Sequence, residues 1–200
     1  KYSGTIEKIR DGDDIIIVAY DSQEQKENYT IDMKIPCFNI NTDAAKKYNQ
    51  QIRALFKEKS ENVMSSNSQK NVIYNVKYKA YEKNNILSLV ILSELKEGDS
   101  SERIIIQTYN YDLKTNKEVT ISDMLNLKNI NTADANNTIK NEINSAQEQN
   151  IKLSELGYNV DIRDVESSEY KIQNAKEFFI GENGYLYVVY AYGNESFTSE

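Results

Sequence analysis

The side chains that most often act as a base, a zinc ligand or a thiol nucleophile are almost absent from this sequence. Among its 200 residues there is no His, and Cys37 is the single Cys. The chain therefore lacks the commonest general base and the commonest zinc ligand. Cys37 cannot form an internal disulfide or a thiolate cluster, and a catalytic role would need a base or a depressed pKa. We interpret it as a small buried residue.

Two acidic runs are the remaining candidates for chemistry. Residues 11–14, Asp-Gly-Asp-Asp, could suggest a calcium loop. They lack the spacing and the terminal bidentate Glu of an EF-hand, so turn chemistry explains them better. Asp161, Asp164 and Glu166 could supply a carboxylate pair for glycoside hydrolysis. Because the chain has 31 acidic residues, such neighbours are common in it. We therefore expect no catalytic residue, no metal and no cofactor, and predict that the protein is not an enzyme.

Tyrosines are the more suggestive residues for binding. The chain has 15 of them, and a tyrosine combines an apolar body with a polar tip, which suits contact surfaces. Tyr185, Tyr187, Tyr190 and Tyr192 alternate over both faces of one expected strand. One face must meet the core, and the other could contact a partner or a glycan. We take these four as the candidate ligand-binding residues; the alternative is that sheet packing alone explains them.

Charge narrows the class of partner. The formal net charge is -7, so the surface repels phosphate backbones and we expect no nucleic-acid binding. The same charge would attract a cationic partner, although it could equally serve solubility. No stretch approaches the roughly 20 apolar residues of a membrane helix. The sequence runs from Lys1 to Glu200 without a visible signal peptide, and we expect an anchor or signal outside it.

Period-2 patterns place these residues on a sheet. Residues 29–37 and 71–80 alternate apolar and polar positions, which is typical of half-buried antiparallel strands. Cys37 continues the apolar face of the first of these strands. Residues 15–20 and 86–92 are apolar on both faces and are expected in the middle of the structure.

Turn and cap residues predict the connections. We expect hairpins at 83–85 and 181–184, a first hairpin turned by residues 11–13, and a left-handed Asn116. Helices are predicted from Asn41 or Thr42 through residue 59 and, more weakly, over 131–149. A capping box at 120–123 opens a short helix through residue 127. Residues 60–70 read as a flexible loop. The fold class is therefore α+β, with antiparallel sheets, two main helices and two interleaved small subdomains.

The order of these pieces resembles a known pair of extracytoplasmic domains. Residues 29–56, "YTIDMKIPCFNINTDAAKKYNQQIRALF", look like the opening of a domain found in PdaC-type peptidoglycan deacetylases. Residues 87–95, 108–125 and 178–192 are similar to the companion domain; "YNYDLKTNKEVTISDML" is the most specific piece. The pair also forms the outer part of RsiV-type lysozyme-sensing anti-sigma factors and occurs in clostridial lipoproteins.

The resemblance implies a division into residues 1–66, PdaC N-terminal-like, and 67–200, RsiV C-terminal-like. It also implies a non-enzymatic binding or sensor domain of a Gram-positive cell-surface protein. Such a domain would be extracytoplasmic, membrane-tethered or lipid-anchored, and would meet a membrane only through an anchor outside this sequence. A cationic protein such as lysozyme, or a cell-wall glycan, is the expected partner. The alternative is a glycan-binding accessory module of a peptidoglycan-modifying enzyme.

Overall fold

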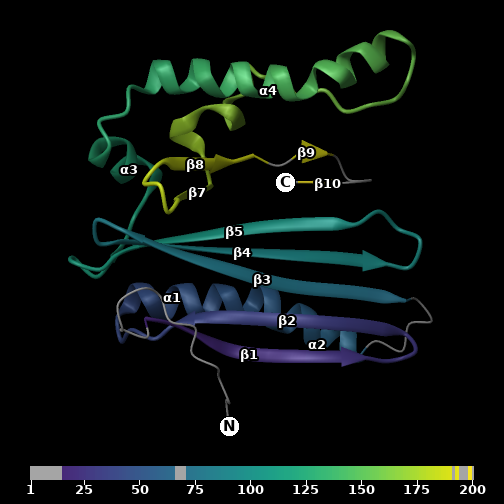
Figure 1. Ribbon diagram of the computed structural model, residues 1–200, viewed down its shortest axis with the longest axis vertical. Helices are drawn as coiled ribbons and strands as arrows, with labels where there is room; N and C mark the ends of the chain where they lie inside the picture. The colour runs from purple at the N-terminus through teal and green to yellow at the C-terminus, as the bar shows by residue number, and fades with distance from the viewer. Residues whose placement is uncertain (1–14, 66–70, 191, 194–197, 200) are drawn as a thin grey trace.

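A large twisted sheet organises the molecule. The computed structural model describes residues 15–65, 71–190, 192–193 and 198–199 (Figure 1). The acidic run at 11–14, with its expected turn, lies outside the described residues. The strands of the sheet are β1 (Ile16–Gln25), β2 (Tyr29–Phe38), β3 (Val72–Lys83), β4 (Ile86–Glu97), β5 (Arg103–Asp112), β6 (Lys117–Glu118), β9 (Tyr192–Gly193) and β10 (Thr198–Ser199).

The helical segment after β2 connects two parallel strands of the main sheet. The main sheet runs β1-β2-β3-β4-β5-β10-β9, and β6 pairs with β5. After β2 the chain forms one helical segment, namely α1 (Asp43–Ile52), the π-helical η1 (Arg53–Lys57) and α2 (Glu58–Ser65). It then returns to β3, which pairs with β2 in parallel, and such a pair requires a crossover connection of this kind.

The α+β class is confirmed, and two details of it differ from expectation. The pairs β1–β2, β3–β4 and β4–β5 are antiparallel as predicted, whereas β2–β3 and β10–β5 are parallel. Residues 60–65, expected in a loop, form the last turns of α2, because Val63 is buried against the core. The sheet continues from β2 to β3 across the expected division at residue 66; that division stays a prediction.

The larger core lies between the sheet and the α1–α2 segment, which runs behind β1–β3 in Figure 1. Thr42 caps α1, since its Oγ1 accepts from the Ala45 N–H at 3.2 Å. This sets Ala45, Tyr48 and Ile52 on the buried side of the helix at helical spacing. Fully buried side chains from β2 to β5 meet them, among them Tyr74 and Tyr111.

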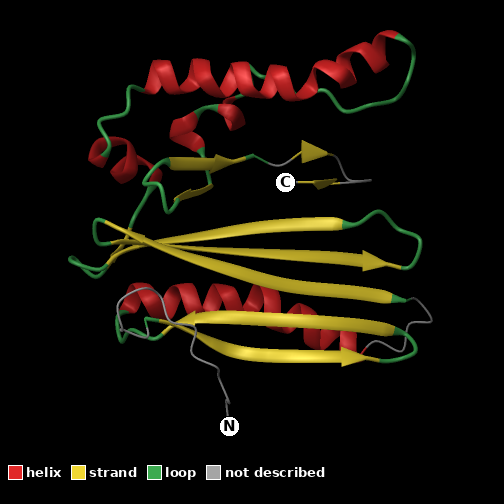
Figure 2. Ribbon diagram, in the orientation of Figure 1, coloured by secondary structure: helices red, strands yellow, loops and turns green. Residues whose placement is uncertain are grey.

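A second layer covers part of the opposite face of the sheet. It consists of α3 (Ile121–Leu127), α4 (Thr132–Glu155), the short turns η2 (Ser168–Tyr170) and η3 (Ile172–Asn174), and the hairpin of β7 (Glu177–Ile180) and β8 (Leu186–Val189) (Figure 2). Its small core includes Ile86, Val119, Met124, Phe178 and Ile180. The capping box is confirmed: Thr120 and Asp123 exchange hydrogen bonds and start α3, which buries Met124.

The predicted turns at 83–85, 116 and 181–184 are confirmed. Asn84 and Asn85 both have positive φ, 53° and 63°, as a two-residue hairpin loop requires. Asn116 is left-handed at φ 59°. The hairpin at 181–184 joins β7 to β8, where the Gly184 N–H donates to the Gly181 carbonyl.

Two strand positions were predicted wrongly. β1 lies at the end of the sheet formed by the described strands, not in its middle. Ile16 and Val18 are nevertheless buried, because one face of β1 belongs to the core. Cys37 leaves the apolar face of β2: Pro36 and Phe38 are buried, and Cys37 between them is half-buried opposite Ile17.

Candidate functional site

Hydrogen bonds from side chains fix the β7–β8 hairpin on the sheet. Asn110, buried in β5, donates to the Phe178 carbonyl at 2.7 Å, and the Ile180 N–H donates to buried Ser88 at 3.0 Å. The Phe178 N–H donates to the Thr108 hydroxyl at 3.0 Å. Side chains of β4 and β5 thus satisfy the backbone groups of β7, which places the hairpin at one definite height above the sheet.

This placement builds a row of three aromatic rings across three strands. Tyr81 of β3 stacks on Phe179 of β7 with ring centroids 5.7 Å apart and planes 15° apart. Phe179 stacks on Tyr187 of β8 at 5.0 Å and 10°. Offset stacking of this kind stabilises aromatic pairs beyond their buried area. We name Tyr81, Phe179 and Tyr187 the aromatic row.

The outer ring of the row is held in place from two sides. A Cβ added to Gly181 would lie 2.6 Å from Tyr187 Cε2, so the absence of a side chain at Gly181 makes room for the ring. Asn183 donates its Nδ2–H to the Tyr187 hydroxyl at 2.7 Å, and its Oδ1 accepts from the Tyr185 N–H. Tyr187 is nonetheless 41% exposed. It is an ordered aromatic surface that meets solvent.

Beside Tyr81 lies a groove of about 580 Å³ on the part of the sheet that β7–β8 leaves uncovered. Lys77, Lys79 and Tyr81 share this face of β3, and their register partners on β4 are Leu92, Val90 and Ser88. The groove is lined by Asp32, Lys34, Val76, Lys77, Tyr78, Lys79, Tyr81, Val90 and Leu92. It therefore combines an apolar floor, a lysine-rich wall and an aromatic end.

Sequence reasoning found one residue of this site and missed the others. Tyr187 was a candidate, and it lies in the aromatic row. Lys77 and Lys79 lie on the polar face of the strand predicted over 71–80 and had no role, and Tyr81 lies just beyond that predicted strand. An aromatic residue among lysines on that face was the feature that could have singled them out.

The other three candidate tyrosines lie apart from the row. Tyr185 is 70% exposed in the turn before β8, and only its backbone is held. Tyr190 packs its ring edge against Tyr170 at 5.5 Å, and burial raises the pKa of its hydroxyl to about 12. Tyr192 belongs to β9, and its side chain is outside the described part. A binding role for these three stays a prediction.

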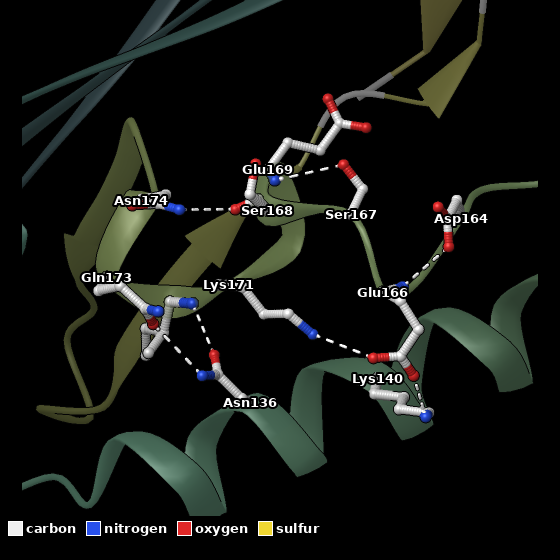
Figure 3. Close-up of polar contacts among 11 residues, drawn as sticks. Asn136, Lys140, Asp164, Glu166, Ser167, Ser168, Glu169, Lys171, Gln173 and Asn174 are labelled. Carbon is white, nitrogen blue, oxygen red and sulfur yellow. Dashed lines mark hydrogen bonds and ion pairs between the residues drawn. The ribbon is translucent and has the colours of Figure 1, made fainter.

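The acidic run at 161–166 attaches a connecting segment to α4 (Figure 3). The Glu166 carboxylate pairs with Lys140 of α4 and, at 3.4 Å, with Lys171. These hydrogen-bonded lysines lower its pKa. Asp164 Oδ1 accepts from the Glu166 N–H at 3.0 Å, and Asn136 of α4 accepts from the Ile172 N–H at 2.7 Å. The Asp164 carboxylate thus stabilises a turn, and the Glu166 carboxylate attaches the connecting segment to α4.

The remaining candidates do not gather into a metal centre within the described residues. Burial raises the pKa of the Cys37 thiol, which opposes thiolate formation. Within residues 15–65, 71–190, 192–193 and 198–199, no three potential ligands of the His, Cys, Asp and Glu types come together to hold a metal ion. In the same part of the chain, no helix is long and apolar enough to span a bilayer.

The fold and groove define an α+β domain with a ligand-sized open surface on one sheet face. No protein-family model matches the chain, and no curated protein matches it.

Solved structures similar to it include two of DUF3298 family proteins. The one from Pseudomonas aeruginosa PAO1 has a TM-score of 0.36 and 15% identity, covering 50% of this chain and 50% of that chain. The chain thus spans about half the length of this neighbour. The one from Bacteroides fragilis NCTC 9343 has a TM-score of 0.37 and 12% identity, covering 76% of this chain and 70% of that chain.

Proposed function

We propose that this chain is a non-enzymatic, extracytoplasmic binding or sensor domain of a Gram-positive cell-surface protein. It would be membrane-tethered or lipid-anchored through a segment outside this sequence. The motif order over residues 29–56 and 108–125 supports this proposal by its resemblance to RsiV-type and PdaC-type outer domains. The lack of His and the raised pKa of the single thiol also favour contact over catalysis.

One observation carries the binding role: Tyr81, one end of the aromatic row, lines an uncovered groove. Stacking fixes Phe179, while Gly181 and Asn183 position Tyr187 before any ligand arrives. A ligand that packs on this surface therefore immobilises few side chains, which lowers the entropic cost of binding. Ordered aromatic residues beside a groove are the residues that usually dominate binding energy.

The same observation favours a glycan as the groove's ligand, and with it the role of accessory module to a peptidoglycan-modifying enzyme. The C–H groups on the flat face of a sugar ring pack well on the electron-rich face of an aromatic ring. A cationic protein such as lysozyme would be repelled by Lys77 and Lys79. It would bind the acidic remainder of the surface instead, since the net charge is -7.

Co-sedimentation with insoluble cell-wall sacculi tests the proposal. We expect the wild-type chain to sediment with the sacculi, and Tyr187→Ala to weaken binding about tenfold or more. Tyr158→Ala is the matched control, because Tyr158 is also solvent-exposed, at 62%, but follows α4. Calorimetry with hen lysozyme at low and moderate salt forms the second arm.

The two arms separate the roles. Sacculus binding that depends on Tyr187 supports the glycan module, and salt-sensitive lysozyme binding that ignores Tyr187 supports the sensor. If neither ligand binds at high micromolar protein, the binding role is wrong. Reproducible hydrolysis of a peptidoglycan fragment by the purified chain would contradict the non-enzymatic role.

A further inference from the structure

The uncovered face of β3 carries a stripe of positive charge. Lys77, Lys79, Tyr81 and Lys83 alternate along the strand, so their side chains share this face. Alternate residues of a strand are about 7 Å apart, which spreads the three lysines over roughly 20 Å. Lys34 of β2 lines the same groove. We name Lys34, Lys77, Lys79 and Lys83 the lysine stripe.

The lysine stripe is unpaired within the part of the chain that the structure describes. No ion pair or side-chain hydrogen bond joins any of its members to another described residue. Some lysines elsewhere are paired, for example Lys47 with Glu118 at 2.7 Å and Lys171 with Glu166 at 3.4 Å. Three carboxylates share this face: Asp32 in the groove, Asp21 opposite Lys34, and Glu94 opposite Asn75. The four lysines outnumber them, so in a chain of net charge -7 the face carries a local excess of positive charge.

The surroundings of the lysine stripe strengthen its attraction for anions. Val90 and Leu92 lie directly opposite Lys79 and Lys77 and form an apolar floor. Apolar groups on one side lower the effective dielectric, so a charge contact there is stronger than one in open water. Lys83 also lines a pocket of about 310 Å³ together with Lys114, Lys128 and Asp112.

A second feature indicates the rest of the ligand. Asp32 lines the groove among the lysines, and its carboxylate accepts hydrogen bonds but repels phosphate or another carboxylate. A ligand that fits both Asp32 and the lysines carries hydroxyl donors as well as anionic groups. The aromatic row adds a place for a ring with an apolar face.

From these contacts we infer that the groove binds an acidic oligosaccharide, a short chain of sugar rings that bear carboxylate or phosphate groups. This inference rests on the proposed binding function and names the chemical class of the ligand. Sugar rings at one end of the chain pack on Tyr187 and Tyr81, and the anionic groups meet Lys79 and Lys77. The hydroxyls of a ring further along donate to Asp32, whose register partner Asn75 lies six residues, roughly 20 Å, from Tyr81. The chain lies along β3, with Lys83 at its far end.

A single-stranded nucleic acid is the rival ligand, because it also joins anionic groups to stacking rings. Two observations favour the sugar. Phe179 stacks on both Tyr81 and Tyr187, which leaves little room for a base to slide between rings. Asp32 in the groove opposes a backbone that carries an anion at every nucleotide but suits sugar hydroxyls.

Calorimetry with four probes tests the inference: an oligogalacturonate hexamer, chitohexaose, polyphosphate and a thymidine hexanucleotide. We expect the oligogalacturonate to bind at least about tenfold more tightly than the other three, with affinity that falls as salt rises. Lys77→Gln/Lys79→Gln should lose about tenfold in affinity for it. Lys46→Gln/Lys152→Gln, which removes two exposed lysines of α1 and α4, is the matched control and should lose less than about twofold.

Each other outcome overturns the inference in a definite way. Equal binding of chitohexaose, unaffected by Lys77→Gln/Lys79→Gln, would show a neutral-glycan site and leave the binding function standing. Tighter binding of the hexanucleotide would make the ligand a nucleic acid. Equal binding of polyphosphate, unaffected by Tyr187→Ala, would remove the sugar. If sacculi or lysozyme bind while the oligogalacturonate does not at millimolar concentration, this inference alone fails. If nothing binds, the proposed function fails with it.

Discussion

Glu177 accepts two hydrogen bonds from a single residue, Thr108. Its Oε2 atom lies 2.6 Å from the Thr108 backbone nitrogen and 2.9 Å from the Thr108 hydroxyl. The Gln107 amide donates to its other oxygen. The first residue of β7 is thereby fixed to β5 without forming a strand pair with it, and the aromatic row depends on this attachment.

Removal of the Thr108 hydroxyl should loosen the hairpin. In Thr108→Val the Phe178 N–H loses its acceptor and Glu177 loses a donor, so we expect a loss of about 1–3 kcal/mol in the free energy of unfolding. Thr108→Ser keeps the hydroxyl and should lose less. Urea unfolding measures both, and hydrogen exchange at the Phe178 amide locates the effect. A loss in Thr108→Ser with none in Thr108→Val would show that the methyl group, not the hydroxyl, matters.

Ser88 and Asn110 should behave as one unit. Ser88 Oγ donates to Asn110 Oδ1 at 2.6 Å and accepts from the Ile180 N–H, and both side chains are almost fully buried. Ser88→Ala and Asn110→Ala each leave buried polar groups without partners and should cost about 1–3 kcal/mol. The double variant should cost less than the sum by about 0.5–3 kcal/mol. Additive losses in a urea double-mutant cycle would mean that the two residues act independently.

The sequence predicts those structural features that neighbouring residues determine, and not those that depend on contacts between distant segments. The left-handed Asn116 and the capped helix after Thr120 form as predicted, because Asn116 and the Thr120–Asp123 pair act through neighbouring atoms. The parallel pairing of β2 with β3 was not predictable in this way. Alternation shows which residues share a face of a strand and says nothing about the direction of the partner strand.

The candidate site shows the same division. The sequence alone made Tyr187 a candidate ligand-binding residue, because it lies on a predicted strand with one face available to a partner. Phe179 is the cross-strand partner of Tyr187 in the predicted β7–β8 hairpin. Tyr81 comes from a distant part of the chain, and the buried contacts of Asn110 and Ser88 with β7 bring it to this pair. A groove assembled by tertiary contacts leaves no periodic pattern in the sequence.

Gly181→Ala should disturb Tyr187 more than it disturbs stability. The new Cβ would lie 2.6 Å from Tyr187 Cε2, and the ring can turn outward to relieve the clash, so we expect a stability loss of about 1 kcal/mol. The stacking on Phe179 would be lost, which should move the ring-proton NMR shifts of Tyr187 and weaken sacculus binding. Gly157→Ala is the control, since it strains a residue with φ +88° in open space. Unchanged Tyr187 shifts in Gly181→Ala would contradict the close packing.

High pH should unfold the larger core by ionising its tyrosines. Burial raises the pKa of Tyr74 to about 12, and burial together with the nearby Glu118 carboxylate raises that of Tyr48 still further. In the unfolded chain a tyrosine ionises near pH 10. Between about pH 10 and pH 12 the unfolded state therefore holds fewer protons than the folded state, and stability falls as pH rises. Below pH 10 this contribution is fully present.

Phenylalanine variants test which tyrosines cause the alkaline loss. Tyr74→Phe and Tyr48→Phe each remove one ionisable group, so the fall in unfolding free energy between pH 10 and pH 12 should be shallower by about 1.4 kcal/mol per unit of pKa difference. At neutral pH each variant loses one hydrogen bond, to the Phe56 or the Asn110 carbonyl, and should be less stable by about 1 kcal/mol. Tyr185→Phe, whose ring is 70% exposed, is the control. Urea unfolding followed across this pH range, with tyrosinate absorbance recorded in parallel, makes the measurement. Identical alkaline slopes in the wild type and both core variants would show that other groups control the transition.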